Sequence, residues 1–344
     1  METLTLANLT HELTGTFILS VAAFLLAMFL TPIYTFLAYR YKFWKKQRST
    51  STTGEPLEVF TKLHANKFKR NIPTMAGLIF VAAIIVVTLF NLDRGETYLP
   101  LAALISGALV GLLDDLINIK GHGKGPAGLR SSLKFLMISV IGLGLGWYFF
   151  MKIGIDVVHV PFLGDWTLGW LIVPLFAFIV VATGNAVNIS DGLDGLAGGL
   201  VSISYGAFGV IALLQGQFFL AGFCFTVVGA LMSYLWFNIY PARFFMGDVG
   251  SFALGTSLGV VAILTNTLFL LPVIGVVFVV EAGSSLIQIT SKTFFHKKVF
   301  ISAPIHHHLE AIGWPETKVT MRFWVIAYVA AFVGVLLALV GGNI

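Results

Sequence analysis

The sequence predicts an all-α integral membrane protein of about ten transmembrane helices, with both termini on the periplasmic or extracellular side. Three observations lead to this fold class. The 344-residue chain is 57% hydrophobic and 11% charged, and its mean hydropathy is +0.91. Apolar runs long enough to cross a bilayer recur along its length. Nearly every charged side chain lies in the short gaps between those runs. This composition is typical of polytopic membrane proteins and excludes a soluble globule.

About 20 apolar residues cross a hydrocarbon core as a helix, and roughly ten segments approach that length. The first lacks a preceding basic region and is longer than the apolar core of a secretion signal, so it is predicted to remain as a membrane span. The eighth and ninth are separated only around Thr265–Leu271, whereas polar or glycine-containing gaps bound the others. In order, the predicted spans are 16–39, 72–91, 98–117, 130–151, 168–187, 195–213, 218–237, 250–267, 270–290 and 321–341.

Positive charges predict the orientation, because Lys and Arg accumulate in the cytoplasmic loops of membrane proteins. With ten helices and an outward N-terminus, the loops after the first, third, fifth, seventh and ninth spans are cytoplasmic. These loops and their flanks hold 19 of the 21 basic residues, and only Arg94 and Lys152 fall on the other side. The opposite orientation would reverse that ratio. The polar loops that carry the motifs are therefore expected to face the cytoplasm.

Residues 1–344 are predicted to form a single membrane domain. The longest polar stretch runs only from about Arg40 to Asn71, and no internal repeat is visible. The one cysteine, Cys224, lies in an apolar run and cannot form an internal disulfide. The formal net charge of +5 favours anionic lipid heads and anionic substrates at the cytoplasmic face. No continuous basic surface with interleaved aromatics is present, which argues against nucleic-acid binding.

Two adjacent carboxylates, Asp114 and Asp115, end the third span. They repel each other and are costly near hydrocarbon unless a cation or positive side chains compensate them. Mg²⁺ suits this position because it binds one or two carboxylates together with substrate phosphates. A solvated helix end is the alternative interpretation. Because adjacent helical residues diverge by about 100°, the two carboxylates are expected to divide their roles.

A polar array, Asn185, Asn188, Asp191 and Asp194, recurs every three residues just before the sixth span. If this stretch is helical, the two aspartates share a face. The neighbouring glycines allow close backbone approach, and a helix N-terminus favours anions. Ordinary capping, with Asp191 as the N-cap, is the competing interpretation. Capping accounts for one aspartate but not for the whole array.

Asp248 directly precedes the eighth span, and Phe245 lies three residues upstream. The carboxylate is a candidate metal ligand or a helix cap, and the aromatic ring offers a face on which a base or sugar can stack. Further along, three consecutive histidines occupy 306–308. They cannot all reach one metal from a regular helix, which disfavours a zinc site. Imidazoles beside a polyanion bind phosphate oxygens and titrate near neutral pH.

All of these motifs fall on the predicted cytoplasmic face. Clustered carboxylates, lysines and histidines suit phosphoryl transfer, where catalysis rests on positioning and on charge neutralisation by Mg²⁺ and cations. The membrane setting suggests that one substrate is a lipid. Only Glu281 lies well inside a span, which argues against the ion relay of a transporter. The residues themselves thus predict Mg²⁺-dependent transfer to or from a lipid phosphate.

These motifs resemble those of the polyprenyl-phosphate N-acetylhexosamine-1-phosphate transferases. The family shares the Asp-Asp pair, the stretch NAVNISDGLDGLA (185–197) and the stretch MGDVGS (246–251). Within the family, three segments are similar to the phospho-N-acetylmuramoyl-pentapeptide-transferase branch: PTMAG (73–77), APIHHHLE (303–310) and GWPETKVTMRFW (313–324). The resemblance runs from about His64 to Trp324. It implies ten transmembrane helices with both termini outside, in agreement with the charge-based topology.

The resemblance implies that undecaprenyl phosphate attacks the β-phosphorus of UDP-N-acetylmuramoyl-pentapeptide. The products would be lipid I and UMP, in the first membrane step of peptidoglycan synthesis at the bacterial plasma (inner) membrane. Mg²⁺ is the implied cofactor and a homodimer the implied assembly. A sister enzyme that uses UDP-N-acetylglucosamine would keep the aspartates but should lack the triple-histidine and GWPE segments.

The resemblance also implies roles for individual residues. Asp248 matches the Mg²⁺ ligand of the family, and Asp114 and Asp115 match the pair assigned to metal binding and to activation of the lipid phosphate, with Asp114 favoured for activation. His306 completes the expected catalytic group and, with His307, matches histidines that contact the phosphate or sugar portion. The remaining substrate-binding matches are Lys69, Thr74, Lys134, Asn185, Asn188, Asp191, Asp194, Asn238, Phe245 and Gln288.

The chain departs from the family pattern at three places. Ala76 replaces a glycine of the usual PTMGG motif, and Asn118 stands where the family has a lysine after its Asp-Asp pair. The lysine common near the following Gly-Leu is displaced, with Lys124 as the nearest cation. We therefore expect this loop to bind the diphosphate differently.

Overall fold

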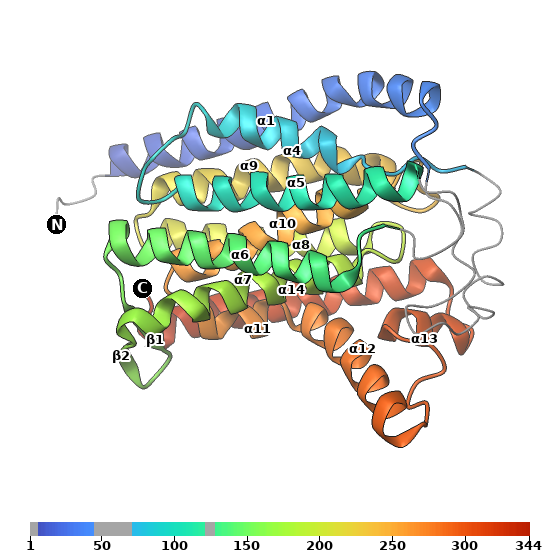
Figure 1. Ribbon diagram of the computed structural model, residues 1–344. Helices are drawn as coiled ribbons and strands as arrows, with labels where there is room; N and C mark the ends of the chain where they lie inside the picture. The colour runs from blue at the N-terminus through green and yellow to red at the C-terminus, as the bar shows by residue number, and fades with distance from the viewer. Residues whose placement is uncertain (1–5, 45–70, 121–127) are drawn as a thin grey trace.

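The structure is a computed structural model that describes residues 6–44, 71–120 and 128–344. These parts of the chain form a helical bundle with one short antiparallel hairpin (Figure 1). The elements are α1 (Leu6–Arg40), α4 (Gly77–Thr88), α5 (Tyr98–Lys120), α6 (Ser131–Tyr148), η1 (Phe149–Ile153), β1 (Val157–Val160), β2 (Gly164–Thr167), η2 (Gly169–Leu171), α7 (Ile172–Ser190), α8 (Leu196–Leu214), α9 (Phe218–Asn238), α10 (Gly247–Leu264), η3 (Leu268–Leu270), α11 (Leu271–Ile274), α12 (Val276–Phe295), α13 (Ile305–Ala311) and α14 (Glu316–Val340).

The all-α membrane fold predicted from the sequence is confirmed. Among the described residues, eight helices are long and apolar enough to cross a membrane, and a bent pair gives a ninth. The predicted second span is shorter than expected, because the 12-residue α4 begins only at Gly77. The chain before it is an irregular segment in which Met75 has a positive φ of 72°. The predicted ninth span is α11 with α12, which are bent by 81° where the helix breaks at Gly275. Beyond the break, α12 leans away from the bundle (Figure 1).

The helix α10 forms the centre of the bundle and packs against α4, α5, α7 and α8. Of its 18 residues only Asp248, in the first turn, is not buried. Glycines bring α5 and α10 into backbone contact. A Cβ atom on Gly107 would collide with Thr256 and Phe252, and one on Gly111 would collide with the carbonyl group of Asp248. This close approach sets the first turn of α10 against the aspartate pair of α5.

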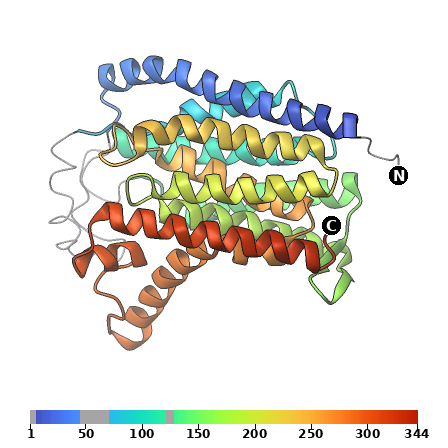
Figure 2. The ribbon, with the colours of Figure 1, turned by 180° about the vertical axis from the view of Figure 1, so that it is seen from behind.

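The two ends of the bundle carry different features. The first turn of α1 and the last turn of α14 lie at the same end, together with the hairpin β1–β2 (Figures 1 and 2). The opposite end carries the last turns of α5, α7 and α9 and the first turns of α6, α8 and α10. The motifs identified in the sequence therefore meet at the end of the bundle away from the chain termini.

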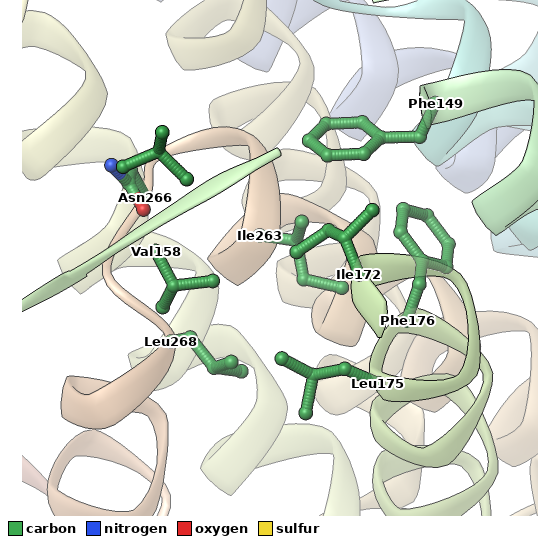
Figure 3. A pocket seen from close by; sticks show the side chains of 9 residues that line it. Phe149, Val158, Ile172, Leu175, Phe176, Ile263, Asn266 and Leu268 are labelled. Carbon is green, nitrogen blue, oxygen red and sulfur yellow. The ribbon is translucent and has the colours of Figure 1, made fainter. Parts of the chain in front are cut away.

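The terminal end is closed by apolar packing beneath the hairpin. Figure 3 shows side chains from η1, β1, α7, α10 and η3 around a pocket of only about 10 Å³. That volume is at or below what one water molecule needs, about 10–15 Å³. The pocket is lined by Phe149, Val157, Val158, Ile172, Leu175, Phe176, Ile263, Asn266 and Leu268. The hairpin is therefore closely packed against η1, α7, α10 and η3.

A histidine of the hairpin joins it to two other segments. The backbone N–H of His159 donates to Asn266 Oδ1 (2.9 Å), its ring Nδ1 lies 2.7 Å from Asp165 Oδ1, and its Nε2 lies 2.9 Å from the carbonyl oxygen of Gly341. Both ring partners are acceptors, so the doubly protonated imidazole satisfies both. The Gly341 hydrogen bond, and then Asp165, raise the pKa of His159 against the smaller opposing effect of burial.

We expect this histidine to make thermal stability depend on pH. Because its pKa is raised by folding, its stabilisation is fully present below the unfolded pKa of about 6.5 and is lost as pH rises through the folded value. His159→Gln should lower the melting temperature by about 2 °C at pH 5.5 and by less at pH 8.5. Thermal unfolding of both proteins across that range measures the difference. Parallel curves for wild type and variant would contradict the prediction.

Candidate active site

The centre of the candidate site is a contact between two carboxylates and one lysine. Asp114 of α5 and Asp248 of α10 face each other within hydrogen-bonding contact. Lys134, in the first turn of α6, places its Nζ 3.4 Å from Asp114 Oδ2 and 3.2 Å from Asp248 Oδ2. The backbone N–H of Leu129 donates to Asp114 Oδ1 at 2.6 Å. Three segments that are distant in sequence therefore converge on one buried, charged point.

Asp115 points to a different partner, as the 100° step between helical neighbours predicts. Its Oδ2 accepts the backbone N–H of Val249 at 3.0 Å and lies against Gly247, whose φ is +73°. The carboxylate is fully buried at the N-terminus of α10, where a negative charge is favoured by the helix dipole. Asp115 thus fixes the first turn of α10, the turn that carries Asp248.

The segment that precedes α4 is held against the same turn. The backbone N–H of Phe245 donates to the Pro73 carbonyl (2.8 Å), and the N–H of Ala76 donates to the Phe245 carbonyl (3.0 Å). The predicted substrate residue Thr74 is 2% exposed, and its hydroxyl lies beside Gly247. Within the described part of the chain this hydroxyl has no hydrogen-bond partner. Phe245 is half-buried between the two segments.

The donor set at the centre fits Mg²⁺. The described residues contain no group of three or more His, Cys, Asp or Glu side chains that could hold a metal ion by themselves. Mg²⁺ does not require one, because it commonly takes one or two carboxylates and completes its octahedron with water and substrate phosphates. Asp114 and Asp248 supply two apposed carboxylates, while Asp115 is turned toward the α10 backbone.

The two aspartates of the α7–α8 connection are not on one helix face. Residues 191–195 form a turn between the two helices, which corrects the helical interpretation of the array. Asp191 is the C-cap of α7 and not the N-cap of α8, a position that Gly195 takes with φ +76°. Asp194 is buried, and its Oδ2 accepts the N–H of Ala242 at 2.9 Å. The glycines open the turn, and Asp194 anchors it to the α9–α10 loop.

The asparagines of the predicted nucleotide-sugar pocket bind neighbouring protein groups. Asn188 Nδ2 donates to Ser251 Oγ at 2.8 Å, and Asn185 Nδ2 donates to the Val181 carbonyl within α7. Asn238 is buried at the end of α9, accepts the Gly195 N–H and donates to the Phe244 carbonyl, both at 2.9 Å. Asn238 therefore joins the α7–α8 turn to the α9–α10 loop, and Asn188 joins α7 to α10. The turn and the loop together border the carboxylate centre.

Gln288 has a similar local role in α12. Its Oε1 accepts the N–H groups of Val299 and Phe300 at 3.0 Å, and its Nε2 donates to the Phe300 carbonyl at 3.0 Å. All three contacts bind the loop that leads to α13. Gln288 therefore fixes the loop that precedes α13, the helix that carries the three histidines.

The three histidines lie on the short helix α13 and have separate partners. His306 is 1% exposed, and its Nδ1 lies 2.7 Å from Oε2 of the fully buried Glu281. His307 Nδ1 lies 2.9 Å from Glu310 Oε2, and the His306 and His307 rings are 4.1 Å apart. His308 Nδ1 accepts the N–H of Ile301. These separate partners agree with the expectation that the run does not bind one metal.

His307 is kept neutral by its surroundings. Burial, and then the neighbouring His306, lower the pKa of His307 to about 4, against the opposite effect of Glu310. At neutral pH its ring is therefore uncharged. His307 therefore does not contribute a positive charge to the binding of a substrate phosphate.

Several residues that build the site were not predicted from the sequence. Glu316, in the first turn of α14, accepts the N–H of Asp194 at 2.7 Å, and Thr320 donates to the Asp194 carbonyl. Gly111 allows the α5–α10 contact, and Leu129 contributes a backbone N–H. Glu281 had a sequence signal, because it is the one acid well inside a predicted span. The predicted substrate residue Lys69 lies outside the described residues.

The amino-acid sequence is similar to a known family and to several named relatives. Residues 97–266 match the model of glycosyl transferase family 4. A phospho-N-acetylmuramoyl-pentapeptide-transferase of Chloroflexus aggregans is 39% identical over 98% of this chain and 93% of its own length. The enzyme of the same name from Geobacillus thermodenitrificans is 37% identical over 91% of this chain and 94% of its own length. The one from Levilactobacillus brevis is 40% identical over 78% of this chain and 84% of its own length.

Proposed function

The chain belongs to the phospho-N-acetylmuramoyl-pentapeptide-transferase family, within glycosyl transferase family 4, and we propose that the Asp114–Lys134–Asp248 centre is where it joins the two substrates. The protein is a multi-pass membrane transferase of peptidoglycan synthesis. In the proposed reaction, a phosphate oxygen of undecaprenyl phosphate attacks the β-phosphorus of UDP-N-acetylmuramoyl-pentapeptide. The bond from that phosphorus to the bridging oxygen breaks, lipid I forms, and UMP leaves.

The observation that supports this site best is the meeting of the two carboxylates at one lysine. Asp114 and Asp248 would hold Mg²⁺, which when bound would supply positive charge to offset that of the phosphates. Lys134 neutralises part of the carboxylate charge and lies within reach of the same phosphates. We assign Asp114 to the acceptor phosphate, whose low demand for a base suits a carboxylate. Asp115 positions Asp248 through the N-terminus of α10.

The donor is assigned to the neighbouring surface formed by the α7–α8 turn, the α9–α10 loop and α13. Asn185, Asn188 and Asp191 lie there half-buried, as does the aromatic ring of Phe245, which offers a stacking surface for uracil. His306 approaches the same turn from α13, where its ring lies against Gly192, and both His306 and His307 are assigned to the phosphate or sugar portion. Asn238, Asp194 and Gln288 support this surface through backbone contacts. Thr74 presents a hydroxyl beside Gly247.

The proposed location is the bacterial plasma membrane with the site facing the cytoplasm. The distribution of positive charge supports this orientation, because 19 of 21 basic residues fall on one predicted side. The site lies at the end of the bundle opposite the first turn of α1 and the last turn of α14, which the same distribution predicts to be outside. A homodimer is the proposed assembly. The mass of the detergent-solubilised protein, corrected for bound detergent by light scattering, tests it.

The function is tested by UMP release from detergent-solubilised protein supplied with both substrates and Mg²⁺. We expect release that EDTA abolishes and that added Mg²⁺ restores, and no release by Asp248→Ala. UDP-N-acetylglucosamine serves as the competing donor in a parallel reaction. Release from that donor alone, or release that is unaffected by EDTA, would contradict the proposal.

A further inference from the structure

Glu281 is a buried carboxylate in α12 that the transfer chemistry described above does not use. Its side chain is 0% exposed, and its Oε2 lies 2.7 Å from Nδ1 of His306. Among the described residues its Oε1 has no hydrogen-bond partner. A carboxylate inside a membrane span is costly unless it is paired, and replacing the whole Glu281–His306 pair by well-packed apolar residues would serve stability as well or better. Stability alone therefore does not explain Glu281, and its contact with His306 indicates a functional role.

The other nitrogen of His306 is directed toward the donor side of the site. A Cβ atom on Gly192 would collide with His306 Nε2, so the ring touches the α7–α8 turn directly. Gly192 follows Asp191, in the surface assigned to the nucleotide sugar. The imidazole thus lies between a buried carboxylate in α12 and the turn that borders the donor.

The proton arrangement follows from the hydrogen bond at Nδ1. If Glu281 is protonated, it donates to Nδ1 and leaves the ring proton on Nε2. If Glu281 is ionised, a doubly protonated ring again carries a proton on Nε2, whereas a neutral ring donates from Nδ1 and leaves Nε2 as an acceptor. A phosphate anion beside Nε2 favours the two arrangements that carry an N–H group there. The other titratable groups that the structure places near His306 are His307, whose ring is 4.1 Å away, and its partner Glu310. His307 directs its Nδ1 to Glu310, whereas the His306 ring touches the α7–α8 turn, so the pair Glu281–His306 is the unit placed to present a donor at that turn.

We propose that Glu281 is a positioning residue, which fixes the His306 ring through Nδ1 so that an N–H group at Nε2 faces a phosphate oxygen of the bound nucleotide-sugar diphosphate. The proposal rests on the donor assignment made above. Carboxylates that orient an active imidazole in this way commonly contribute 10-fold to 100-fold, on the order measured for metal-bound histidines. The ring would otherwise be free to rotate about its side-chain bonds or to take the other tautomer.

Two substitutions separate this role from a structural one. Glu281→Leu removes the hydrogen bond and should lower kcat/KM for the donor by about 10-fold to 100-fold, mainly through KM. Its melting temperature should fall, because His306 Nδ1 stays buried and loses its partner, so the kinetics are measured below the onset of unfolding. Glu281→Gln keeps a hydrogen-bonding partner at Nδ1 and should recover most of the activity lost in the leucine variant.

The decisive comparison is a double-mutant cycle with His306→Ala. If Glu281 acts only through His306, adding Glu281→Leu to His306→Ala should change kcat/KM by less than about 2-fold. An equal loss in both backgrounds would overturn the proposal, as would wild-type kinetics for Glu281→Leu. Full activity of His306→Ala would remove the donor role of His306 and the inference with it. Wild-type UMP release in the same assay shows independently whether the transferase function holds.

Glu96 provides a matched control at the other end of the bundle. Its Oε2 accepts the N–H of Leu220 at 2.8 Å, and burial raises its pKa, so it too is a hydrogen-bonded glutamate, although only half-buried. Glu96→Gln should affect melting temperature without changing the donor KM. A change in donor KM as large as that of Glu281→Leu would show that the kinetic effect is general to such substitutions and would overturn the assignment.

Discussion

Asp248→Asn is expected to reduce kcat by about 10³-fold or more while leaving the protein at least as heat-stable as wild type. Loss of activity follows because this carboxylate, at the first turn of α10, faces Asp114 at the centre of the site. Charge stabilisation of this kind is commonly worth about 10²–10³ in kcat for a single donor and more for a metal ligand. Asparagine keeps the volume but cannot balance the charge of a divalent cation.

Stability should move in the opposite direction for an electrostatic reason. Asp114 and Asp248 lie in contact and share the ammonium group of Lys134. Like charges in contact away from bulk water disfavour the folded state unless a cation is added. Removing one charge relieves that repulsion, and Lys134 remains paired with Asp114.

A titration with Mg²⁺ gives a measurement that does not depend on turnover. Because a ligand that binds only the folded state raises its stability by mass action, the melting temperature of wild type should increase with Mg²⁺. Asp248→Asn should show a much smaller increase. Asp156→Asn, at the opposite end of the bundle, is the control and should behave as wild type. A large fall in melting temperature, or an undiminished response to Mg²⁺, would contradict the assignment of Asp248.

The sequence predicts the fold well because the strongest physical signals of a membrane protein are one-dimensional. Apolar runs and the distribution of basic residues identify the helices without knowledge of their neighbours. Two spans deviate for local reasons. Residues before Gly77 are held by the backbone of Phe245, and the helix breaks at Gly275. Neither effect is visible in hydropathy.

The site is less predictable because its geometry depends on how the helices face one another. Carboxylates, asparagines and histidines are conspicuous in the sequence, and their collection at one end follows from topology. The contacts that each of these side chains makes do not follow from topology. Asp194 and Asn238 engage backbone groups 48 and 43 residues away, and the partner of Glu281 comes from a different helix 25 residues later. Such pairings are fixed by tertiary packing, which a single sequence does not specify.

The α5–α10 interface shows how strongly catalysis depends on that packing. Gly111 lies three residues before Asp114, and any Cβ atom at this position would overlap the backbone carbonyl of Asp248. Because a backbone group cannot rotate away as a flexible side chain can, the two helices would have to separate. Separation would move Asp248, in the first turn of α10, away from Asp114, which faces it, and from Asp115, which binds the backbone of that turn.

We therefore expect Gly111→Ala to reduce activity by about 10²-fold or more, since a displacement of about 1 Å in a reacting group can cost that much. It should also destabilise the protein by about 1–3 kcal/mol, the usual range for overpacking. The result would be notable because alanine is the better helix former by about 1 kcal/mol. Local propensity and tertiary contact make opposite predictions at this position.

Gly144→Ala is the matched control for this substitution. Gly144 is also within a membrane helix, α6, but a Cβ atom there would meet no atom within 4 Å. The added methyl group should therefore leave activity unchanged and stability equal or slightly improved. Measuring kcat and melting temperature for the two variants side by side isolates the effect of helix approach from that of helix propensity. If Gly111→Ala behaves like Gly144→Ala, the contact between α5 and α10 does not control the distance between the catalytic carboxylates. If it loses activity and stability together while its counterpart loses neither, the spacing of these two helices is itself part of the catalytic apparatus.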